Sequence, residues 1–399
     1  MTKMTKLEEL IKKYCPNGVG QKQLKFICTI ETGKLNANVA TDIGKYMFFT
    51  TAKEPSKINT YRWDTEALLV AGNANIGDVK YYKGKFDAYQ RTYVLTNFIN
   101  DVNIKFLYYV LSNNLKKYLN NRKNEAAMTY IVLSTLQNFS VPLPPMPVQQ
   151  EIVRILDKFT ELTKELTKEL TKRKQQYQLY RDSLLTFDNP CSYIKKLVDK
   201  YCPDGVEYKE LSEIFDIRNG YTPSKAKAEY WENGVIPWFR MEDIRTNGNI
   251  LSEAIQHITI EAMKNKPFPP NSIIVSTTAT IGEHALITVP FLSNQRFTCL
   301  TLKDEFKDKY DIKFLFYYCY KLDKFCLNNI NKSNFASVDM SKFRKFKFPL
   351  PPIEVQQRIV SILDRFDSLC NNIVEGLPAE ITARQKQYEF FRDKLLCFE

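Results

Sequence analysis

The sequence repeats itself once along its length. YCPNGV at 14–19 returns 187 residues later as YCPDGV at 201–206. LLVAGNANIG at 68–77 returns 205 residues later as IIVSTTATIG, and the pair Gln90-Arg91 returns at the same spacing as Gln295-Arg296. Ordered matches of this kind indicate two homologous units, each of which must reach a similar fold.

The repeat continues into the second part of each unit. PLPP and VQQEIVRILDKF, at 142–145 and 148–159, return 207 residues later as PLPP and VQQRIVSILDRF. The last shared segment, at 176–185, returns 211 residues later at 387–396 with QY, RD and LL in common. Because proline can continue neither a strand nor a helix, each PLPP segment is predicted to end a domain and to precede a long helix.

The two units differ mainly in the region before these prolines. The spacing grows there from 187 to 205 residues, so the second unit contains 18 more residues. Short apolar runs between Gly and Asn turns, such as 67–70 and 272–275, predict strands of a mixed α/β domain. A shared scaffold that carries two different central regions suggests two domains that recognise different targets. The predicted segments are a domain at 1–147, a helix at 148–190, a domain at 191–354 and a helix at 355–399.

Both long helices carry an apolar stripe. In the second helix the stripe alternates at spacings of three and four residues, which is the pattern of a coiled coil. Its residues are Ile359, Ile362, Phe366, Leu369 and Ile373. We predict that the two stripes pair as an antiparallel two-helix coiled coil, which would relate the units by a pseudo-twofold axis. The alternative is that each stripe packs on its own domain as an ordinary core helix.

Two local features modify these helices. Gly376 and Pro378 are expected to kink or break the second one. The first contains three tetrads of sequence ELTK at 161–172, which on one interpretation only stabilise a helix. On the other interpretation the tetrads are a ruler, because each lengthens a helix by about 6 Å and rotates the next part of the chain by about 40°.

Basic residues outnumber acidic residues. There are 57 Lys and Arg against 45 Asp and Glu, which gives a formal charge of +12 and a pI near 9.0. This excess has two interpretations, the solubility of a Lys-rich chain or a surface for nucleic acid. No run approaches the roughly 20 apolar residues of a membrane span, and 1–13 has the pattern of an amphipathic helix and not of a signal peptide. We therefore expect a soluble, cytoplasmic protein.

The residues of an enzyme or a metal site are scarce. The nine Cys form no C-x-x-C pair, so we expect reduced and packed thiols. Only His257 and His284 could supply imidazole, which leaves little for a zinc site or a catalytic triad. Phosphate-binding G-x-x-x-x-G-K-[ST], G-x-G-x-x-G and a methyltransferase loop of the type Asn-Pro-Pro-aromatic are all missing. Asp204, Glu207 and Lys209 superficially resemble a nuclease site, but their first-unit counterparts are not acidic, so we expect a turn there.

Together these segments resemble the specificity subunit of type I restriction–modification enzymes. Each unit is a variable domain closed by P-L-P-P-x-x-x-Q-Q-x-I-V-x-I-L-D-x-F and by a helix that ends in Q-Y-x-x-x-R-D-x-L-L. WENGVIPW at 231–238 and TTATIG at 277–282 also look like signatures of that family's second domain. The resemblance covers essentially the whole chain.

The resemblance implies a fold and a role. In that family two homologous target-recognition domains are separated by a long antiparallel two-helix coiled coil, and each reads one half of a bipartite, asymmetric DNA sequence. The helices set the spacer between the half-sites and dock two methyltransferase subunits, and the full assembly adds two motor-nuclease restriction subunits. The subunit is not catalytic on its own and binds no cofactor or metal. S-adenosylmethionine, ATP and Mg²⁺ belong to its partners.

Candidate DNA contacts are polar or basic residues on loops of the recognition domains. Arg reads guanine, Asn and Gln read adenine, and Lys binds phosphate. In the first domain the candidates are Lys34, Arg62, Asn73, Asn75, Lys80 and Arg91. In the second they are Arg218, Tyr221, Lys225, Arg240, Arg245, Thr278 and Arg296. Gln90 and Gln295 could equally be structural hydrogen-bonding residues.

Two other functions stay open at this point. The chain could be a scaffold whose coiled coil assembles protein partners while its domains read no sequence. A self-contained restriction or methylation enzyme is disfavoured by the missing motifs.

Overall fold

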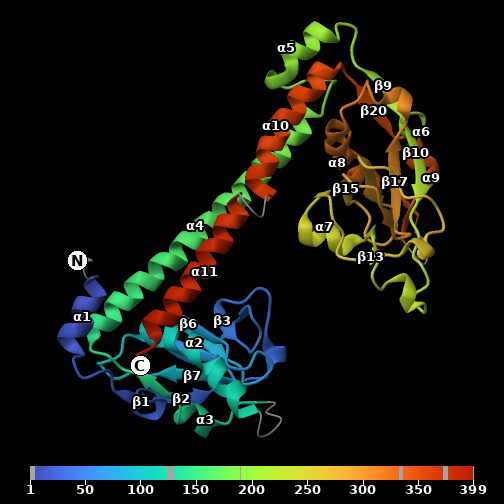
Figure 1. Cartoon of the computed structure of the whole chain (residues 1–399). Coiled ribbons are helices and arrows are strands. Elements are labelled where there is room, and N and C mark those ends of the chain that lie inside the picture. The colour runs from blue at the N-terminus through green and yellow to red at the C-terminus, as the bar shows by residue number, and fades with distance from the viewer. Residues whose placement is uncertain (1–4, 124–129, 189, 332–335, 372–375, 399) are drawn as a thin grey trace. The chain divides into compact units, whose positions relative to one another are not determined.

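The computed structural model of the chain describes residues 5–123, 130–188, 190–331, 336–371 and 376–398. The chain divides into two compact units. Unit 1 consists of Met1–Thr167 and Ile381–Glu399, and unit 2 consists of Lys168–Glu380. The division passes through the long helix α4 (Met146–Leu184) and assigns the C-terminal helix to unit 1 (Figure 1).

Unit 1 is built on a six-stranded sheet of strand order β2-β7-β5-β6-β3-β4. The strands are β2 (Thr29–Thr32), β3 (Tyr46–Phe49), β4 (Ser56–Ile58), β5 (Trp63–Ala71), β6 (Val79–Ala88) and β7 (Thr92–Thr96). A separate ribbon pairs β1 (Gln21–Gln23) with β8 (Ser140–Pro142). The helices are α1 (Lys6–Tyr14), α2 (Ile104–Lys123), α3 (Leu133–Gln137), the first part of α4 and most of α11 (Leu377–Leu396). Helix α1 confirms the amphipathic helix predicted within 1–13, of which 1–4 lie outside the described residues.

Unit 2 repeats this plan with an addition. Its main sheet has the order β10-β17-β14-β15-β12, from β10 (Phe215–Asn219), β12 (Ile250–Leu251), β14 (Ser272–Ser276), β15 (His284–Ile287) and β17 (Phe297–Leu302). Smaller pairings join β9 (Glu207–Glu210) to β20 (Lys347–Leu350) and β18 (Ile330–Asn331) to β19 (Ser337–Val338). The helices are α5 (Ser192–Tyr201), α6 (Leu211–Ile214), α7 (Met241–Asn247), α8 (Ile312–Asn328), α9 (Met340–Arg344), α10 (Ile353–Asn371) and the second part of α4.

The same register holds the central strands of both units. Leu68 of β5 lies opposite Leu95 of β7, and their counterparts Ile273 of β14 and Leu300 of β17 lie opposite each other. One following helix packs on each sheet, α2 on β5 and β6 and α8 on β15. Strong β formers at corresponding positions therefore give both units one frame, as the repeat predicts.

In unit 2 a second, smaller sheet is separate from the main sheet. A three-stranded sheet of order β13-β11-β16 joins β11 (Ile236–Phe239), β13 (His257–Ile258) and β16 (Leu292–Ser293). Trp238 and Phe239 of β11 are buried in a cluster with Phe291 and Phe297. Unit 1 has the corresponding pairing in its own sheet, where β3 joins β4 and, in parallel, the end of β6, so that Phe49 opposite Ala88 matches Phe239 opposite Ser293. The second unit adds helix α7 and strand β12 between β11 and β13.

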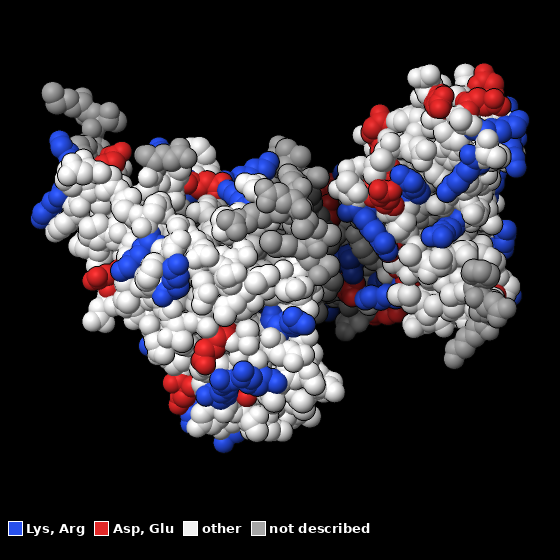
Figure 2. All heavy atoms as spheres, turned by 90° about the horizontal axis from the view of Figure 1, so that it is seen from below, with Lys and Arg blue, Asp and Glu red and all other residues white. Residues whose placement is uncertain are grey.

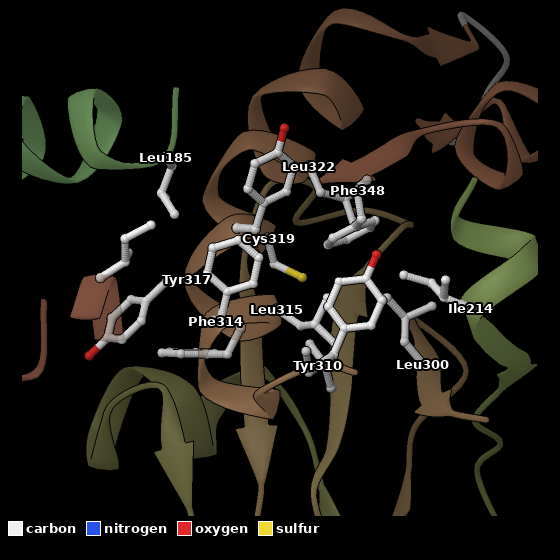
Figure 3. Packing of buried hydrophobic residues seen from close by; sticks show 14 of the residues in the cluster. Leu185, Ile214, Leu300, Tyr310, Phe314, Leu315, Tyr317, Cys319, Leu322 and Phe348 are labelled. Carbon is white, nitrogen blue, oxygen red and sulfur yellow. The ribbon is translucent and has the colours of Figure 1, made fainter. Parts of the chain in front are cut away.

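Helix α8 carries the largest core of unit 2. Asp311 caps the helix by accepting hydrogen bonds from the backbone N–H groups of Lys313 and Phe314. One side of α8 then buries Phe314, Leu315, Cys319 and Leu322 among side chains of the sheet and of β20 (Figure 3). Full burial of an apolar side chain contributes roughly 1.5–3 kcal/mol, so this cluster provides much of the stability of the unit.

A buried glutamine joins the long helix of each unit to its domain. In unit 1 the Gln149 side chain accepts from the Asn103 N–H (2.8 Å) and donates to the carbonyls of Asp101 (2.8 Å) and Pro144 (2.7 Å). In unit 2 Gln356 makes the three equivalent bonds, to Asp311 (2.9 Å), Lys309 (2.8 Å) and Pro351 (2.7 Å). This is the structural reason for the first Gln in the repeated Q-Q pair.

The aspartate of the repeated I-L-D segment makes a second matched contact. Asp157 accepts hydrogen bonds from the Tyr109 hydroxyl (2.7 Å) and from Lys105 (2.8 Å). Asp364 accepts from Tyr317 and Lys313 at the same two distances, 2.7 and 2.8 Å. Burial, with the Asp364 hydrogen bond next, raises the pKa of Tyr317 and keeps its hydroxyl a donor.

The apolar stripes pair within each unit, which confirms the predicted helix pairing. In unit 1 Phe159 of α4 stacks on Phe391 of α11, with ring centroids 5.5 Å apart. In unit 2 Tyr177 and Tyr180 of α4 lie against Phe366 of α10, at 6.4 and 5.2 Å. The helix ends also join the domain cores, through Ile152 and Leu156 in unit 1, so the alternative interpretation holds for those turns.

The second long helix is interrupted, as the glycine and proline predict. Helix α10 ends at Asn371 and α11 begins at Leu377. Ile373, which belongs to the predicted stripe, lies outside the described residues.

Candidate nucleic-acid interface

The repeated Gln-Arg pair occupies the same turn in both units. This Gln-Arg turn comprises 89–92 in unit 1 and 294–297 in unit 2. In unit 1 the Thr92 N–H donates to the Tyr89 carbonyl at 2.8 Å, and in unit 2 the Phe297 N–H donates to the Asn294 carbonyl at 3.2 Å. Both turns therefore present glutamine and arginine from equivalent backbone positions.

A glycine from a neighbouring segment packs against each turn. A Cβ on Gly33 would lie 1.9 Å from the Ala88 carbonyl oxygen, and a Cβ on Gly220 would lie 2.3 Å from the Ser293 oxygen. Both distances are far too short for a real contact, so only glycine fits there. The close approach places each Gln-Arg turn directly against the segment that carries its glycine.

A second loop adjoins each turn and carries backbone strain. This alanine loop comprises 72–77 in unit 1 and 277–282 in unit 2. Ala74 and Ala279 have φ of 52° and 68°, a region that costs an alanine roughly 1–2 kcal/mol. The Gly72 N–H donates to the Arg91 carbonyl (2.8 Å), and the Thr277 N–H donates to the Arg296 carbonyl (3.1 Å). Strain of this kind is concentrated at functional sites, and here it recurs in both units.

Unit 2 has a polar hollow beside its Gln-Arg turn. The hollow has a volume of about 580 Å³ and lies between the turn, the 3₁₀ helix η3 (Ala228–Tyr230) and the ends of β11. Its lining residues are Thr222, Lys225, Ala228, Trp231, Glu232, Trp238, Arg240, Gln256, Asn294, Gln295 and Arg296. Three of the predicted DNA contacts, Lys225, Arg240 and Arg296, are therefore brought together.

Fixed hydrogen bonds shape the wall of this hollow. The Trp231 and Trp238 rings meet edge to face, with centroids 5.0 Å apart, and their indole N–H groups donate to the carbonyls of Ser224 and Tyr221, both at 3.0 Å. The Arg240 guanidinium contacts Glu242 at 2.8 Å, while its Nε is buried without a partner. The hollow therefore combines fixed aromatic walls with the cationic side chains of Lys225, Arg240 and Arg296, which suits a planar, acceptor-rich ligand.

Four of the predicted DNA contacts are exposed and have no polar side-chain partner among the described residues. They are Lys34, Arg91, Lys225 and Arg296. The Arg91 guanidinium lies over the Tyr130 ring, 5.6 Å from its centroid. These cations are available to a ligand without the loss of an existing ion pair.

Most other predicted residues are already engaged inside their own unit. Arg62 pairs with Glu31 (3.4 Å), Lys80 with Asp78 (3.0 Å) and Arg245 with Glu283 (3.2 Å).

The remaining engaged residues bind backbone groups. Asn75 and Arg218 donate to the carbonyls of Thr51 and Lys266, both at 2.8 Å. Tyr221 accepts from the Lys264 N–H at 2.8 Å, which gives it a structural role. Asn73 and Thr278 form equivalent backbone bridges in their alanine loops, to Tyr130 and Ser337.

Several residues that line the hollow were not predicted from the sequence. Trp231, Trp238, Gln256 and Asn294 were not among the predicted contacts. The W-E-N-G-x-I-P-W segment was a usable signal for the two tryptophans, because it begins and ends with them. Gln256 had no local signal, since only the tertiary fold brings it to the hollow.

The one buried histidine pair of the described chain has no access to a substrate. His284 is 0% exposed, and its Nδ1 lies 2.6 Å from an Asp323 carboxylate oxygen. The ring is enclosed by Phe316 and Tyr320, so the pair joins β15 to α8. Among the described residues no group of three His, Cys, Asp or Glu side chains could hold a metal ion. Within that part of the chain, no helix is both long and apolar enough to cross a membrane.

Charge alone does not locate the interface. On the face shown in Figure 2, Lys and Arg side chains form several separate groups with Asp and Glu between them. The location therefore rests on the matched loops and the hollow.

Two segments of the chain, 16–173 and 203–383, match the family model described as the type I restriction modification DNA specificity domain. The chain belongs to the type I specificity subunits. It is 38% identical to the EcoR124I/EcoR124II specificity subunit of Escherichia coli over 313 residues, 75% of this chain and 72% of that one. It is 53% identical to the EcoprrI specificity subunit of Escherichia coli, over 52% of this chain and 53% of the relative.

Solved structures show the same fold. This type I specificity subunit is similar to the S subunit from M. genitalium, with a TM-score of 0.54 and 15% identity over 96% of this chain and 97% of that one. It is also similar to a chain from a study of the complex assembly and conformational transition of the type I R-M system, with a TM-score of 0.57 and 16% identity over 96% and 98% of the two chains. The mixed α/β fold class with two homologous recognition domains is confirmed.

Proposed function

We propose that the chain reads a bipartite, asymmetric DNA sequence, one half with the recognition domain of each unit, and directs partner subunits to it. The observation that carries the proposal is that one structural frame bears different loops in its two copies. The strand register, the Gln-Arg turn and the alanine loop recur, whereas the side chains around the turn differ: Trp231, Trp238 and Arg240 line a hollow in unit 2, and Tyr130 lies against Arg91 in unit 1. Two unlike readers on one chain suit a target with two unlike halves.

Under this proposal the partner subunits carry out the catalytic reactions. The chain is a non-catalytic subunit that acts with two methyltransferase and two restriction subunits in the cytoplasm. S-adenosylmethionine, ATP and Mg²⁺ bind to those subunits.

A methylation map tests the proposed function. The chain is co-expressed with a methyltransferase subunit of its own system, and methylated adenines are mapped over the genome. We expect a single gapped motif with two unlike halves. A short ungapped motif would show that only one domain reads DNA. An unmethylated genome, with complex formation verified, would favour the protein scaffold instead.

Two matched apolar side chains support the docking of two copies of one partner. Leu179 of α4 in unit 2 and Phe390 of α11 in unit 1 are separated by the repeat spacing of 211 residues. They are 74% and 64% exposed, whereas the next most exposed large apolar side chains described on α4, α10 and α11 are Leu369 of α10 and Leu162 of α4, at 40% and 38%. Nothing in the fold requires an apolar residue at either place. We assign the two side chains to the methyltransferase contact.

Polar substitution of these residues should remove the partner copies one at a time. Burial of such a side chain contributes about 1.5–3 kcal/mol, so Leu179→Ser or Phe390→Ser should weaken one of two partner sites by roughly 10- to 100-fold. Native mass measurement of the complex should show the loss of one methyltransferase copy in each single variant and of both in the double variant. Val235→Ser, at a side chain 63% exposed in the recognition domain of unit 2, is the control and should keep both copies. Full occupancy in the double variant would contradict the assignment.

A further inference from the structure

The repeated Gln-Arg pair is exposed in both recognition domains. Gln90 and Arg91 correspond to Gln295 and Arg296, and all four residues are exposed. The backbone around them is the same in both units, down to the glycine beneath each turn. The surroundings differ, since Thr222 and the hollow adjoin the turn in unit 2, whereas Tyr130 lies against Arg91 in unit 1. Identical side chains on an identical frame are therefore placed between unlike neighbours.

The Gln-Arg pair offers hydrogen-bond donors to a ligand. An arginine side chain can only donate, and neither Arg91 nor Arg296 has an acidic partner among the described residues. In unit 2 the Gln295 side-chain oxygen already accepts a hydrogen bond from the Thr222 hydroxyl, which leaves its amide nitrogen for a ligand. Three oxygen-rich ligand edges fit such a set: a phosphodiester, a guanine edge and a carboxylate.

We propose that the Gln-Arg turn of each unit binds the DNA phosphodiester backbone, with Arg91 and Arg296 as equivalent anchors that position the two half-sites. The inference rests on the proposed function. Residues that are identical in the two readers cannot distinguish half-sites that differ, so they contact what every half-site has in common. The sugar–phosphate backbone is common to all sequences, whereas a shared base pair is required by nothing in the two units.

The same argument distinguishes the residues that anchor the DNA backbone from the residues that read its bases. Lys225, Arg240 and the tryptophans line the hollow of unit 2. They are not repeated in unit 1, where the strand register places Phe48 and Thr50 at the positions of Trp238 and Arg240. They belong to the part of the interface that differs between the readers. The turn positions the DNA backbone on each recognition domain, and the unit-specific residues then read the bases.

Arginine removal tests the proposal through the salt dependence of binding. Arg91→Ala and Arg296→Ala are assayed as the full chain in complex with its methyltransferase subunit, on duplex DNA that carries the mapped motif. We expect each variant to bind about tenfold more weakly and the slope of log K against log salt to fall by about 1, because one phosphate contact is lost. The methylated motif should keep every base position in both half-sites. Arg91→Lys and Arg296→Lys should restore most of the slope.

The controls separate this result from a loss of fold or of surface charge. Lys83→Ala and Lys307→Ala remove exposed cations that already pair with Glu66 and Asp304, and should leave the slope nearly unchanged. The thermal unfolding midpoint of the arginine variants should match the wild type.

Two outcomes would overturn the proposal. If the motif of Arg296→Ala relaxes at a base position, the arginine reads a base. If both the affinity and the slope stay at wild-type values, the turn does not touch DNA. In either case the proposed function stands as long as the wild type gives a gapped motif, and the absence of that motif in the wild type would refute the proposed function itself.

Discussion

Deletion of residues 164–167 should shorten the spacer between the two half-sites by about one or two base pairs and leave the sequence of both half-sites unchanged. The deleted tetrad lies within a stretch of α4, from 160 to 176, in which no side chain is buried. The stretch begins after the Phe159 contact to α11 and ends before the Tyr177 contact to α10. The deletion therefore removes no core residue from either unit.

The size of the effect comes from helix geometry. Four residues correspond to about 6 Å of rise and a rotation of about 40°, while a base pair occupies about 3.4 Å along DNA. The methylation map measures the spacer directly. Replacement of the same four residues by alanine is the matched control, because it keeps the helix length and should keep the spacer. A changed half-site with an unchanged spacer would refute the ruler interpretation of the tetrads.

Gln356→Leu should lower the free energy of unfolding of unit 2 by about 3–5 kcal/mol. The substitution keeps the approximate size of the side chain but removes three hydrogen bonds from a position that is 0% exposed. The Asp311 N–H and the carbonyls of Lys309 and Pro351 would be left without this partner in the interior, at a cost of about 1–3 kcal/mol each. Helix α10 would then lose its polar connection to the domain.

The neighbouring glutamine provides the control for this experiment. Gln357 is the second residue of the same Q-Q pair and is exposed, so Gln357→Leu should change the stability by less than about 0.5 kcal/mol. Denaturant unfolding followed by circular dichroism measures both variants. Equal stabilities of the two variants would show that the buried amide makes no net contribution. The equivalent pair in unit 1, Gln149 and Gln150, permits an independent repeat of the test.

Much of the fold could be predicted because the repeat and the periodicity are local properties of the chain. The prolines at 142–145 predicted the end of a domain and the start of a long helix. The stripe at spacings of three and four residues predicted the pairing of the long helices, which the contact between Phe159 and Phe391 confirms. Helix α5, by contrast, was not predicted, although it corresponds to α1 in the repeat. Its ten residues follow shortly after the long helix, and their pattern was not recognised as a separate helix.

The candidate site was only partly accessible from the sequence. Residue type identified Arg91, Lys225 and Arg296 as cations on loops, and the structure leaves all three without an ionic partner among the described residues. Residue type also selected Asn75 and Arg218, which bind backbone carbonyls of their own unit instead. Both groups contain the same kinds of side chain, and only the long-range neighbours differ.

The sequence by itself determined that there are two homologous units, that a long helix follows each PLPP segment and which faces of the long helices are apolar. These properties depend on spacing along the chain and on the identity of single residues. The tertiary structure decided which glutamine of each Q-Q pair is buried, which of the predicted arginines lack an ionic partner among the described residues and where unit 2 has its hollow. Those outcomes depend on partners 24 to 48 residues away or more, such as Thr51 for Asn75 and Lys266 for Arg218, and no local pattern specifies them.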